Sequence, residues 1–234
     1  MITLRRAAER GHASHGWLDS FHSFSFAGYY DPAHMGYGPL RVINEDRVKP
    51  GMGFGTHGHR DMEILSYVLE GRLQHKDSLG NGSTIAPGDV QRMSAGRGVM
   101  HSEYNPSETE GVHFLQIWIE PSVRGVAPGY EQKHVEPAAM RNRLAMIAGP
   151  AGSGAAVSIH QDAAVYAALL DGTTEVSHDL EEDRRAYVHV ARGKVAVNDQ
   201  VLEAGDAAKL EREGRITLSH VTYGEAEVLL FDLP

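Results

Sequence analysis

The chain of 234 residues contains no cysteine. Disulfide bridges, iron–sulfur clusters and thiolate zinc sites are therefore excluded. It also has no apolar run of the roughly 18 residues that a transmembrane helix needs. Three arginines near the N-terminus, at positions 5, 6 and 10, are not followed by a hydrophobic segment, so the sequence offers no secretory signal. We expect a cytoplasmic protein that does not enter a membrane.

Clusters of basic residues are missing as well. The 22 Lys and Arg residues are scattered among 31 Asp and Glu residues, and the formal net charge is −9. Proteins that bind nucleic acid through its phosphates concentrate positive charge on one face. The composition therefore argues against direct binding to nucleic acid. The apolar fraction of 41% is ordinary, and a chain of this length can form one or two globular domains.

Glycine, in contrast, is abundant, with 26 residues that often separate short apolar runs. The runs 64–69 (ILSYVL) and 112–119 (VHFLQIWI) are predicted strands, and 79–82 (LGNG) is typical of a hairpin turn. Helix is scarce, and we expect one short helix over 137–143. Many short strands with regular turns favour an all-β fold of β-barrels or jelly rolls.

A Pro/Gly-rich segment over 121–137 divides the strand series in two. We therefore predict an N-terminal domain over 1–130 and a C-terminal domain over 131–234. The two halves share a pattern in which a strand ends at a Gly and a later turn contains Gly-Asp. Tyr67 to Gly71 with Pro87-Gly88-Asp89 is echoed by Tyr187 to Gly193 with Ala204-Gly205-Asp206. This weak internal repeat predicts two copies of one β-barrel unit in tandem.

Two short motifs, His57-Gly58-His59 and His101-Ser102-Glu103, are the strongest functional signal. Residues i and i+2 of a strand project from the same face. Two such strands side by side would direct three imidazoles and one carboxylate to one point. We therefore predict a metal site in the N-terminal domain. The C-terminal domain has no comparable motif, since His178, His189 and His220 are isolated, and we expect it to bind no metal.

The predicted ligand set limits the choice of metal. Three imidazoles and a carboxylate suit Fe, Mn, Co, Ni, Cu or Zn but not Ca or Mg. A four-coordinate zinc ion would be saturated by such a set. A six-coordinate iron would keep two adjacent positions open, enough for a substrate oxygen and dioxygen. Glu63 is an alternative carboxylate ligand, because it lies an even number of residues from His59.

Residues 56–105 closely resemble the pirin family of bicupins, as do residues 21–48 and the run 114–119 (FLQIWI). This resemblance implies two cupin domains in tandem, of which the first binds metal. It implies His57, His59, His101 and Glu103 as ligands, with Glu63 in a supporting role, and Fe(II) as the metal. It also implies a dioxygenase of the quercetin 2,3-dioxygenase type, whose substrates are a flavonol-like enol and dioxygen. In that reaction Glu103 is the catalytic base.

Two other functions remain open from the sequence. An iron-binding, redox-responsive regulator that binds protein partners without turnover would need the same metal ligands. A cupin isomerase, in which the metal polarises a carbonyl group, rests on analogy of fold alone. We expect a monomer, because two barrels in one chain already supply an internal pairing.

Several residues near the motifs receive a structural interpretation. The alternation of Phe21, His22, Phe24 and Phe26 is interpreted as a strand that packs one face onto the barrel, in preference to a platform for the substrate. His75 is expected at an exposed strand end, away from the site. Gln116 and Trp118 share one face of the strand over 112–119, where they line either a cavity or the core.

Overall fold

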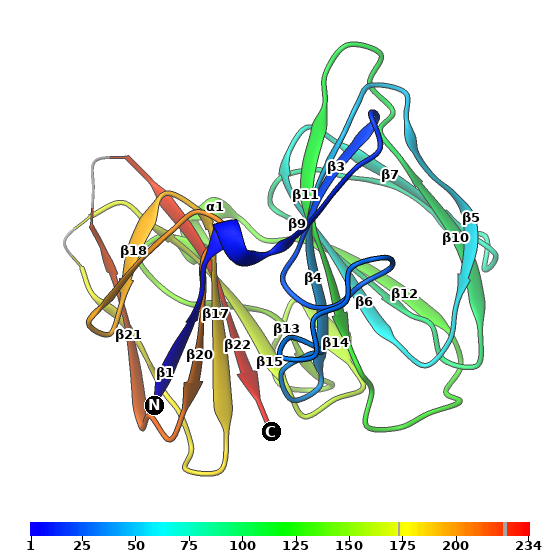
Figure 1. Cartoon of the computed structure of the whole chain (residues 1–234). Helices are drawn as coiled ribbons and strands as arrows, with labels where there is room; N and C mark the ends of the chain where they lie inside the picture. Colours follow the sequence, from blue (N-terminus) through cyan, green and yellow to red (C-terminus); the bar gives the residue numbers. More distant parts are fainter. Residues whose placement is uncertain (173, 222–223) are drawn as a thin grey trace. The chain divides into compact units, whose positions relative to one another are not determined.

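The computed structural model describes residues 1–172, 174–221 and 224–234. Strands account for 57% of the residues and helices for 3%, which confirms the predicted all-β class. Each half contains a large sheet and a four-stranded sheet of cupin type rather than a closed barrel (Figure 1). The chain forms two compact units. The N-terminal unit comprises Gly11–His134 and Val157–Gln161, and the C-terminal unit comprises Met1–Arg10, Val135–Ala156 and Asp162–Pro234.

The N-terminal unit is built from antiparallel strands. They are β2 (Gly11–Ser14), β3 (Leu18–His22), β4 (Leu40–Val48), β5 (Gly53–His59), β6 (Glu63–Glu70), β7 (Leu73–Asp77), β8 (Gly82–Ile85), β9 (Asp89–Ser94), β10 (Val99–Tyr104), β11 (Val112–Ile119), β12 (Gly129–His134) and β14 (Val157–Ile159). The large sheet has the order β12-β9-β6-β11-β4-β3-β2, and the small sheet has the order β5-β10-β7-β8. Both predicted motifs, at 57–59 and 101–103, therefore lie in the small sheet.

The C-terminal unit contains the remaining elements. They are β1 (Ile2–Arg5), the 3-10 helix η1 (Ala7–Glu9), α1 (Pro137–Met140), β13 (Ala145–Pro150), β15 (Ala164–Leu170), β16 (Val176–Asp179), β17 (Arg185–Arg192), β18 (Lys194–Val197), β19 (Gln200–Glu203), β20 (Ala207–Glu211), β21 (Arg215–His220) and β22 (Ala226–Leu233). Its strands follow the orders β1-β20-β17-β22-β15-β13 and β16-β21-β18-β19. Helix α1 falls inside the predicted range 137–143. Among the described helices, none has the length and hydropathy that crossing a membrane requires.

The two units share one topology, as the internal repeat predicts. Strand β6 corresponds to β17, β9 to β20, β11 to β22 and β4 to β15, and the small sheets match strand for strand. The glycines of the repeat occupy equivalent turns. Gly71 and Gly193 both have φ +74°, and Gly88 and Gly205 have φ +89° and +84°. Residues with a Cβ rarely adopt these angles. The glycines therefore repeat because the turns at these positions need a positive φ.

The first ten residues depart from the predicted domain ranges. Residues 1–130 were expected to form one domain, but β1 pairs with β20, from Ile2 opposite Leu210 to Arg5 opposite Ala207 (Figure 1). In the C-terminal unit β1 therefore takes the place at the sheet edge that β12 takes in the N-terminal unit. Conversely, Val157–Gln161 belongs to the N-terminal unit. A composition shift marks where a linker lies, but it carries no information on pairing between distant strands.

Apolar side chains hold the two sheets of the N-terminal unit together. Val48, Val68 and Phe114 from the large sheet pack with Leu73 and Ile85 from the small sheet, and all five are buried. The buried area of such a cluster supplies the main favourable free energy of folding. It also fixes the spacing of the sheets, which carry the candidate site on regular strands rather than on loops.

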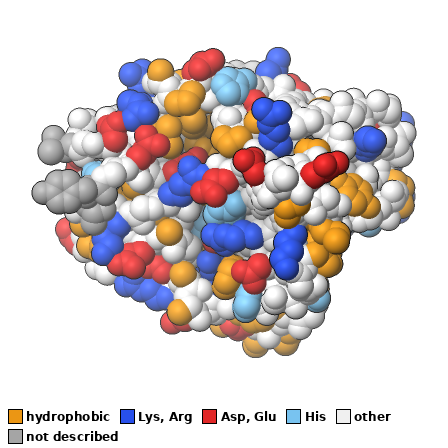
Figure 2. Space-filling model, turned by 90° about the horizontal axis from the view of Figure 1, so that it is seen from above, with side chains coloured by type: hydrophobic (Ala, Val, Ile, Leu, Met, Phe, Trp, Pro, Cys, Tyr) orange, Lys and Arg blue, Asp and Glu red, His pale blue; other side chains and the backbone are white. Residues whose placement is uncertain are grey.

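The surface carries charges of both signs. On the face drawn in Figure 2, Lys and Arg side chains are interspersed with Asp and Glu side chains, without a broad field of either sign. This distribution agrees with the scattered charges of the sequence.

We expect Gly53→Ala to destabilise the chain, because strand β10 passes directly over this position. A Cβ at Gly53 would lie 2.2 Å from the backbone oxygen of Glu103. Overpacking of this kind costs about 1–3 kcal/mol in the free energy of unfolding, measured by urea denaturation. Gly55→Ala is the matched control on the same strand, since its Cβ would meet only the Tyr104 hydroxyl, at 3.9 Å. Equal stability of the two variants would contradict the expectation.

Candidate metal centre

The pairing of β5 with β10 brings the two histidine-containing motifs together. His57 lies directly opposite His101, and His59 lies opposite Val99. The register shifts between His101 and Glu103, where two steps along β10 match three along β5. Such a bulge re-aims side chains on the strand that carries the extra residue. The expectation that the two motifs lie on neighbouring strands is thus met by a pairing with one irregularity.

The three imidazoles converge through their Nε2 atoms. His101 Nε2 lies 3.0 Å from Nε2 of His57 and 3.0 Å from Nε2 of His59. His101 is buried, while the other two are half-buried. One nitrogen from each residue therefore faces a common point that is accessible from one side.

The protonation states suit metal ligands. His57 donates its Nδ1 proton to the carbonyl of Gly55 at 2.8 Å, which leaves Nε2 as the ring nitrogen that can bind a metal. Burial, together with neighbouring histidines, lowers the pKa of His59 to about 4 and that of His101 to about 3. Both rings are therefore neutral at physiological pH, as metal coordination requires.

The donor set fits a transition metal ion. A single proton on His101 Nε2 cannot serve good hydrogen bonds to both neighbouring nitrogens, whereas a cation among three lone pairs interacts with all of them. The two separations of 3.0 Å would allow all three nitrogens to bind one ion at the distances that are usual for imidazole ligands. Imidazole ligands are typical of Fe, Ni, Cu and Zn sites.

Glu103 lies near His101 but is not grouped with His57 and His59 among the described residues, and two polar side chains hold it. Ser66 Oγ lies 3.1 Å from its Oε1, and Gln116 donates from Nε2 to its Oε2 at 3.0 Å. Burial raises the pKa of Glu103 to about 7, with a further contribution from Asp46. Ser66 also contacts Gln116 Oε1 at 2.9 Å, and a hydroxyl has one proton to donate. The Ser66 proton can therefore serve only one of the two oxygens, Glu103 Oε1 or Gln116 Oε1, at a time.

His75 is much closer to the centre than we expected from the sequence. It is fully buried, and its Nδ1 lies 3.4 Å from Nδ1 of His101, while its Nε2 meets Asp77 at 3.1 Å. His75, His101 and Glu103 form a second set of candidate ligands, which shares His101 with the set His57, His59 and His101. Strand β7 pairs with β10 and places His75 opposite Glu103. The expectation of an exposed strand end was therefore wrong.

Glu63, the alternative carboxylate, faces other partners. It is buried, accepts a hydrogen bond from Ser94 Oγ at 2.7 Å and lies 3.2 Å from Nδ1 of His160. It belongs to neither set of candidate ligands among the described residues. Its role in this structure is to tie β6 to β9 and to the segment that contains His160.

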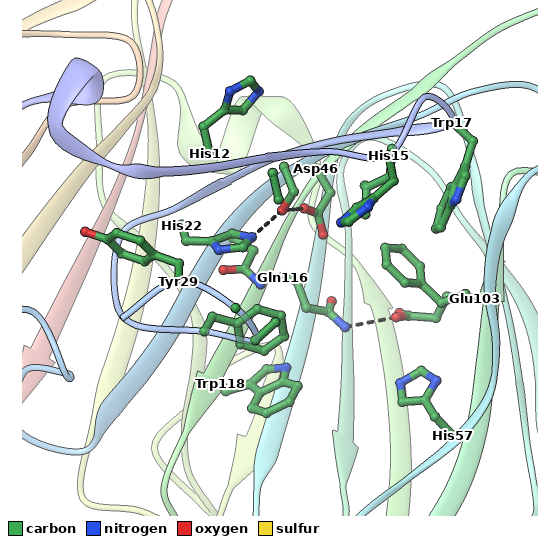
Figure 3. Close-up of a pocket in the computed structure, with 18 residues that line it drawn as sticks. His12, His15, Trp17, His22, Tyr29, Asp46, His57, Glu103, Gln116 and Trp118 are labelled. Atoms are coloured by element: carbon green, nitrogen blue, oxygen red, sulfur yellow. Dashed lines mark hydrogen bonds between the residues drawn. The ribbon is translucent and has the colours of Figure 1, made fainter. Parts of the chain in front are cut away.

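A cavity of about 770 Å³ opens beside the histidines (Figure 3). His57, Glu103 and Gln116 line it, and its walls are aromatic, formed by Trp17, Phe26, Tyr29, Phe54 and Trp118. The ring of Trp118 contacts the His59 ring edge-on, with centroids 4.9 Å apart. A volume of this size and an aromatic lining are typical of sites for planar organic ligands.

His22 and Phe26 line this cavity, whereas strand packing was the favoured interpretation of their alternation and a substrate platform the alternative. Strand β3 ends at His22, and Phe26 lies beyond it with its ring edge against Trp118, at a centroid distance of 5.4 Å. Phe24 is buried, as predicted. The packing interpretation therefore holds for part of the segment only.

A second buried carboxyl, Asp46 of β4, also lines the cavity. Ser20 of the adjacent strand β3 donates a hydrogen bond to it, and Ser20 Oγ lies 2.8 Å from His22 Nε2. Burial raises the pKa of Asp46 to about 7, and the neighbouring Glu45 adds to this effect, while the Ser20 hydrogen bond opposes it.

Family models match both halves of the chain. A model described as Pirin matches residues 3–119, and a model described as quercetinase C-terminal cupin domain matches residues 146–233. The chain belongs to the pirin family. Its two units are thus the two cupin domains of a pirin, as the resemblance implied.

Bacterial relatives are similar to this pirin over its whole length. It is 47% identical over 234 residues to a quercetin 2,3-dioxygenase from Escherichia coli strain K12, which covers 100% of this chain and 99% of the relative. A pirin-like protein from Caulobacter vibrioides is 41% identical over 233 residues, with 99% of each chain covered. The crystal structure of the bacterial pirin YhhW from Escherichia coli in complex with nickel(II) has a TM-score of 0.93 and 46% identity, covering 100% of this chain and 99% of that one. The nickel complex of a relative supports a metal site in this fold.

We expect Asp46→Asn to reduce the pH dependence of stability in the metal-free protein. The pKa of Asp46 is about 7 in the folded chain against an ordinary 3.8, so the folded state binds the proton more tightly. The contribution of Asp46 to the free energy of unfolding is fully present below pH 4 and is lost as the pH rises from about 4 to about 7. Urea denaturation at pH 5 and pH 8 should show a loss roughly 2 kcal/mol smaller for the variant than for the wild type.

Asp179→Asn is the control for this comparison, because the Asp179 side chain is 80% exposed in the C-terminal unit. It should follow the wild type at both pH values. If Asp46→Asn did the same, burial of Asp46 would have no effect on its titration.

Proposed function

We propose that this pirin is a metal-dependent dioxygenase of the quercetin 2,3-dioxygenase type. Its metal is held by His57, His59, His101 and Glu103, and its substrates are a flavonol-like enol and dioxygen. The observation that carries the proposal is the cavity of about 770 Å³, which is walled by aromatic residues and meets the candidate ligands at His57 and Glu103 (Figure 3). The name of the 47%-identical relative supports the reaction type.

The cavity suits a planar aromatic substrate. Trp118 and Phe26 pack edge to face on one wall, and Trp17 and Phe54 do so on another, with centroids 5.4 and 5.3 Å apart. Such walls bind the faces of fused rings and exclude water from the reacting edge. They orient the substrate so that its hydroxyl group reaches the centre between His57 and Glu103.

Glu103 accepts the proton of the substrate hydroxyl. Its carboxyl group lies at the inner edge of the cavity, and Ser66 and Gln116 hold both of its oxygens. Ser66 and Gln116 fix the orientation of this carboxyl group. One of its oxygens can therefore exchange its hydrogen bond for one with the substrate while the backbone of β10 stays in place. Proton transfer to a positioned group typically contributes 10²–10⁴-fold to a rate. When bound, the transition metal supplies Lewis acidity and a place where substrate and dioxygen meet.

Fe(II) is the metal that we propose for turnover. Three imidazoles and a carboxylate leave open positions on a six-coordinate ion, and iron combines such positions with dioxygen chemistry. Nickel in the crystal structure of YhhW shows that the fold of a close relative accepts another ion.

A regulator that only senses the redox state of iron would need the ligands but no cavity. The aromatic cavity beside the ligands therefore favours the enzyme. Uptake of dioxygen with a flavonol separates the two functions, since a regulator would bind metal and consume none.

His101→Ala should abolish stoichiometric metal binding, because His101 lies between the other two imidazoles. The test is the metal content per chain after anaerobic loading with Fe(II), followed by dioxygen consumption with quercetin. In the wild type, consumption should track bound iron. His134→Ala is the control, because His134 is an exposed residue that pairs with Asp89 outside the cavity. Retention of metal by the His101 variant would refute the proposed ligand set.

Glu103→Gln should lower turnover far more than metal content, because glutamine keeps the shape of the side chain but is not a base. We expect a loss of at least about 10²-fold in kcat with at least half of the iron retained. Glu108→Gln, in an exposed loop, serves as the control. Undiminished activity in the Glu103 variant would rule out its role as the base.

A further inference from the structure

A row of polar side chains crosses the inner face of the large sheet and ends at Gln116, which donates a hydrogen bond to Glu103. Ser20 pairs with Asp46 and His22 pairs with Asn44 across β3 and β4, and Asn44 pairs with Gln116 across β4 and β11. Because cross-strand partners share a face of the sheet, these side chains point the same way. All five line the cavity, and we call them the polar floor.

Only one of the two carboxylate oxygens of Asp46 accepts a hydrogen bond from the described residues. Ser20 donates to Oδ1, and no described residue donates to Oδ2. The residue is only 4% exposed, but it lines the cavity, and Figure 3 shows it among the other side chains that do so. A buried carboxyl group with a free oxygen is costly unless a ligand or water satisfies it.

Asn44 provides a second, independent observation. It is 3% exposed and lines the cavity, yet its side chain makes no hydrogen bond with any described residue, and its Oδ1 is buried. Buried amides are almost always hydrogen-bonded. Asn44 and Asp46 are two positions apart on β4, and both line the cavity. An unpaired amide and an unpaired carboxylate oxygen at these two positions indicate a binding site for polar groups of a ligand.

The charges around the cavity define the chemistry of those groups. No Lys or Arg is among the described residues that line it, whereas two carboxyl groups, Asp46 and Glu103, are. An anionic substituent such as a carboxylate or sulfate would therefore be repelled. A neutral hydroxyl group can donate to Asp46 and accept from the amide of Asn44 at the same time.

We propose that Asp46 and Asn44 determine substrate specificity by hydrogen bonding a phenolic hydroxyl group on a ring remote from the metal-binding edge of the substrate. This inference rests on the proposed function and narrows its substrate class to polyhydroxylated, uncharged aromatic enols. Ser20 is a positioning residue, because it holds the carboxyl group of Asp46 and itself contacts His22.

The test compares two flavonols that share the metal-binding edge. Quercetin has hydroxyl groups on its outer rings, and 3-hydroxyflavone has none. Their dissociation constants are measured with the Fe(II)-loaded protein under anaerobic conditions, by quenching of tryptophan fluorescence. Trp17 and Trp118 line the cavity and report on binding without turnover. The variants are Asp46→Leu and Asn44→Leu, which remove the polar atoms but keep the branching and the number of heavy atoms, and Asp46→Asn, which keeps a hydrogen-bonding group.

We expect each Leu variant to bind quercetin about tenfold more weakly, since one hydrogen bond is lost, and to bind 3-hydroxyflavone within twofold of the wild type. Asp46→Asn should restore part of the affinity for quercetin. Asn44→Leu should unfold at the same or a higher temperature than the wild type without ligand, because it removes an unpaired buried amide. A merely structural role of Asn44 would predict the opposite shift.

Equal loss of affinity for both flavonols, or no loss for either, would overturn the inference. Its failure is distinct from failure of the proposed function. If the wild type consumed no dioxygen with either flavonol, the dioxygenase would be wrong, while a selective loss of quercetin binding would still support the polar floor. Asp179→Asn, far along the chain in the C-terminal unit and 80% exposed, should leave both dissociation constants unchanged.

Discussion

The antiparallel register of β5 and β10 is the constraint on which the functional site depends. It places His57 opposite His101 and turns three imidazoles to one side of the small sheet. Side chains alternate along a strand, so a shift of one residue would point these groups to the other face. The neighbouring strand β7 and the close approach at Gly53 restrict such a shift, because there is no space for a side chain between Gly53 and β10.

Electrostatics links the candidate ligands to the rest of the cavity. Burial favours neutral forms throughout, lowering the pKa values of His59 and His101 and raising those of Glu103 and Asp46. A cation near these groups acts in the opposite sense on the carboxyl groups, because it favours their ionised forms. Binding of a metal ion is therefore coupled to the release of protons. The protons come from the ligands and also from other carboxyl groups close enough for the positive charge to lower their pKa.

Much of this arrangement is predictable from the sequence, for identifiable reasons. Period-two spacing is a local property, so the pairs at 57–59 and 101–103 indicated a common face before any fold was known. The resemblance to pirins then indicated the cupin topology, and two family models match it. The positions of His75, Asn44 and Asp46 were not predictable, because each depends on which strand lies alongside. Nothing in the sequence around His75 shows that β7 pairs with β10 and buries it.

Strand β1 has a consequence for the order in which the chain folds. During synthesis the N-terminal unit is complete once Gln161 has emerged, so its sheets can form early. Ile2 must wait for Leu210 before its backbone groups find their partners in β20. Until then an apolar edge segment remains available to other chains, the condition under which strand exchange and aggregation compete with folding. The C-terminal unit therefore closes last, and β1, although it precedes the N-terminal unit in the chain, is among the last strands to be ordered.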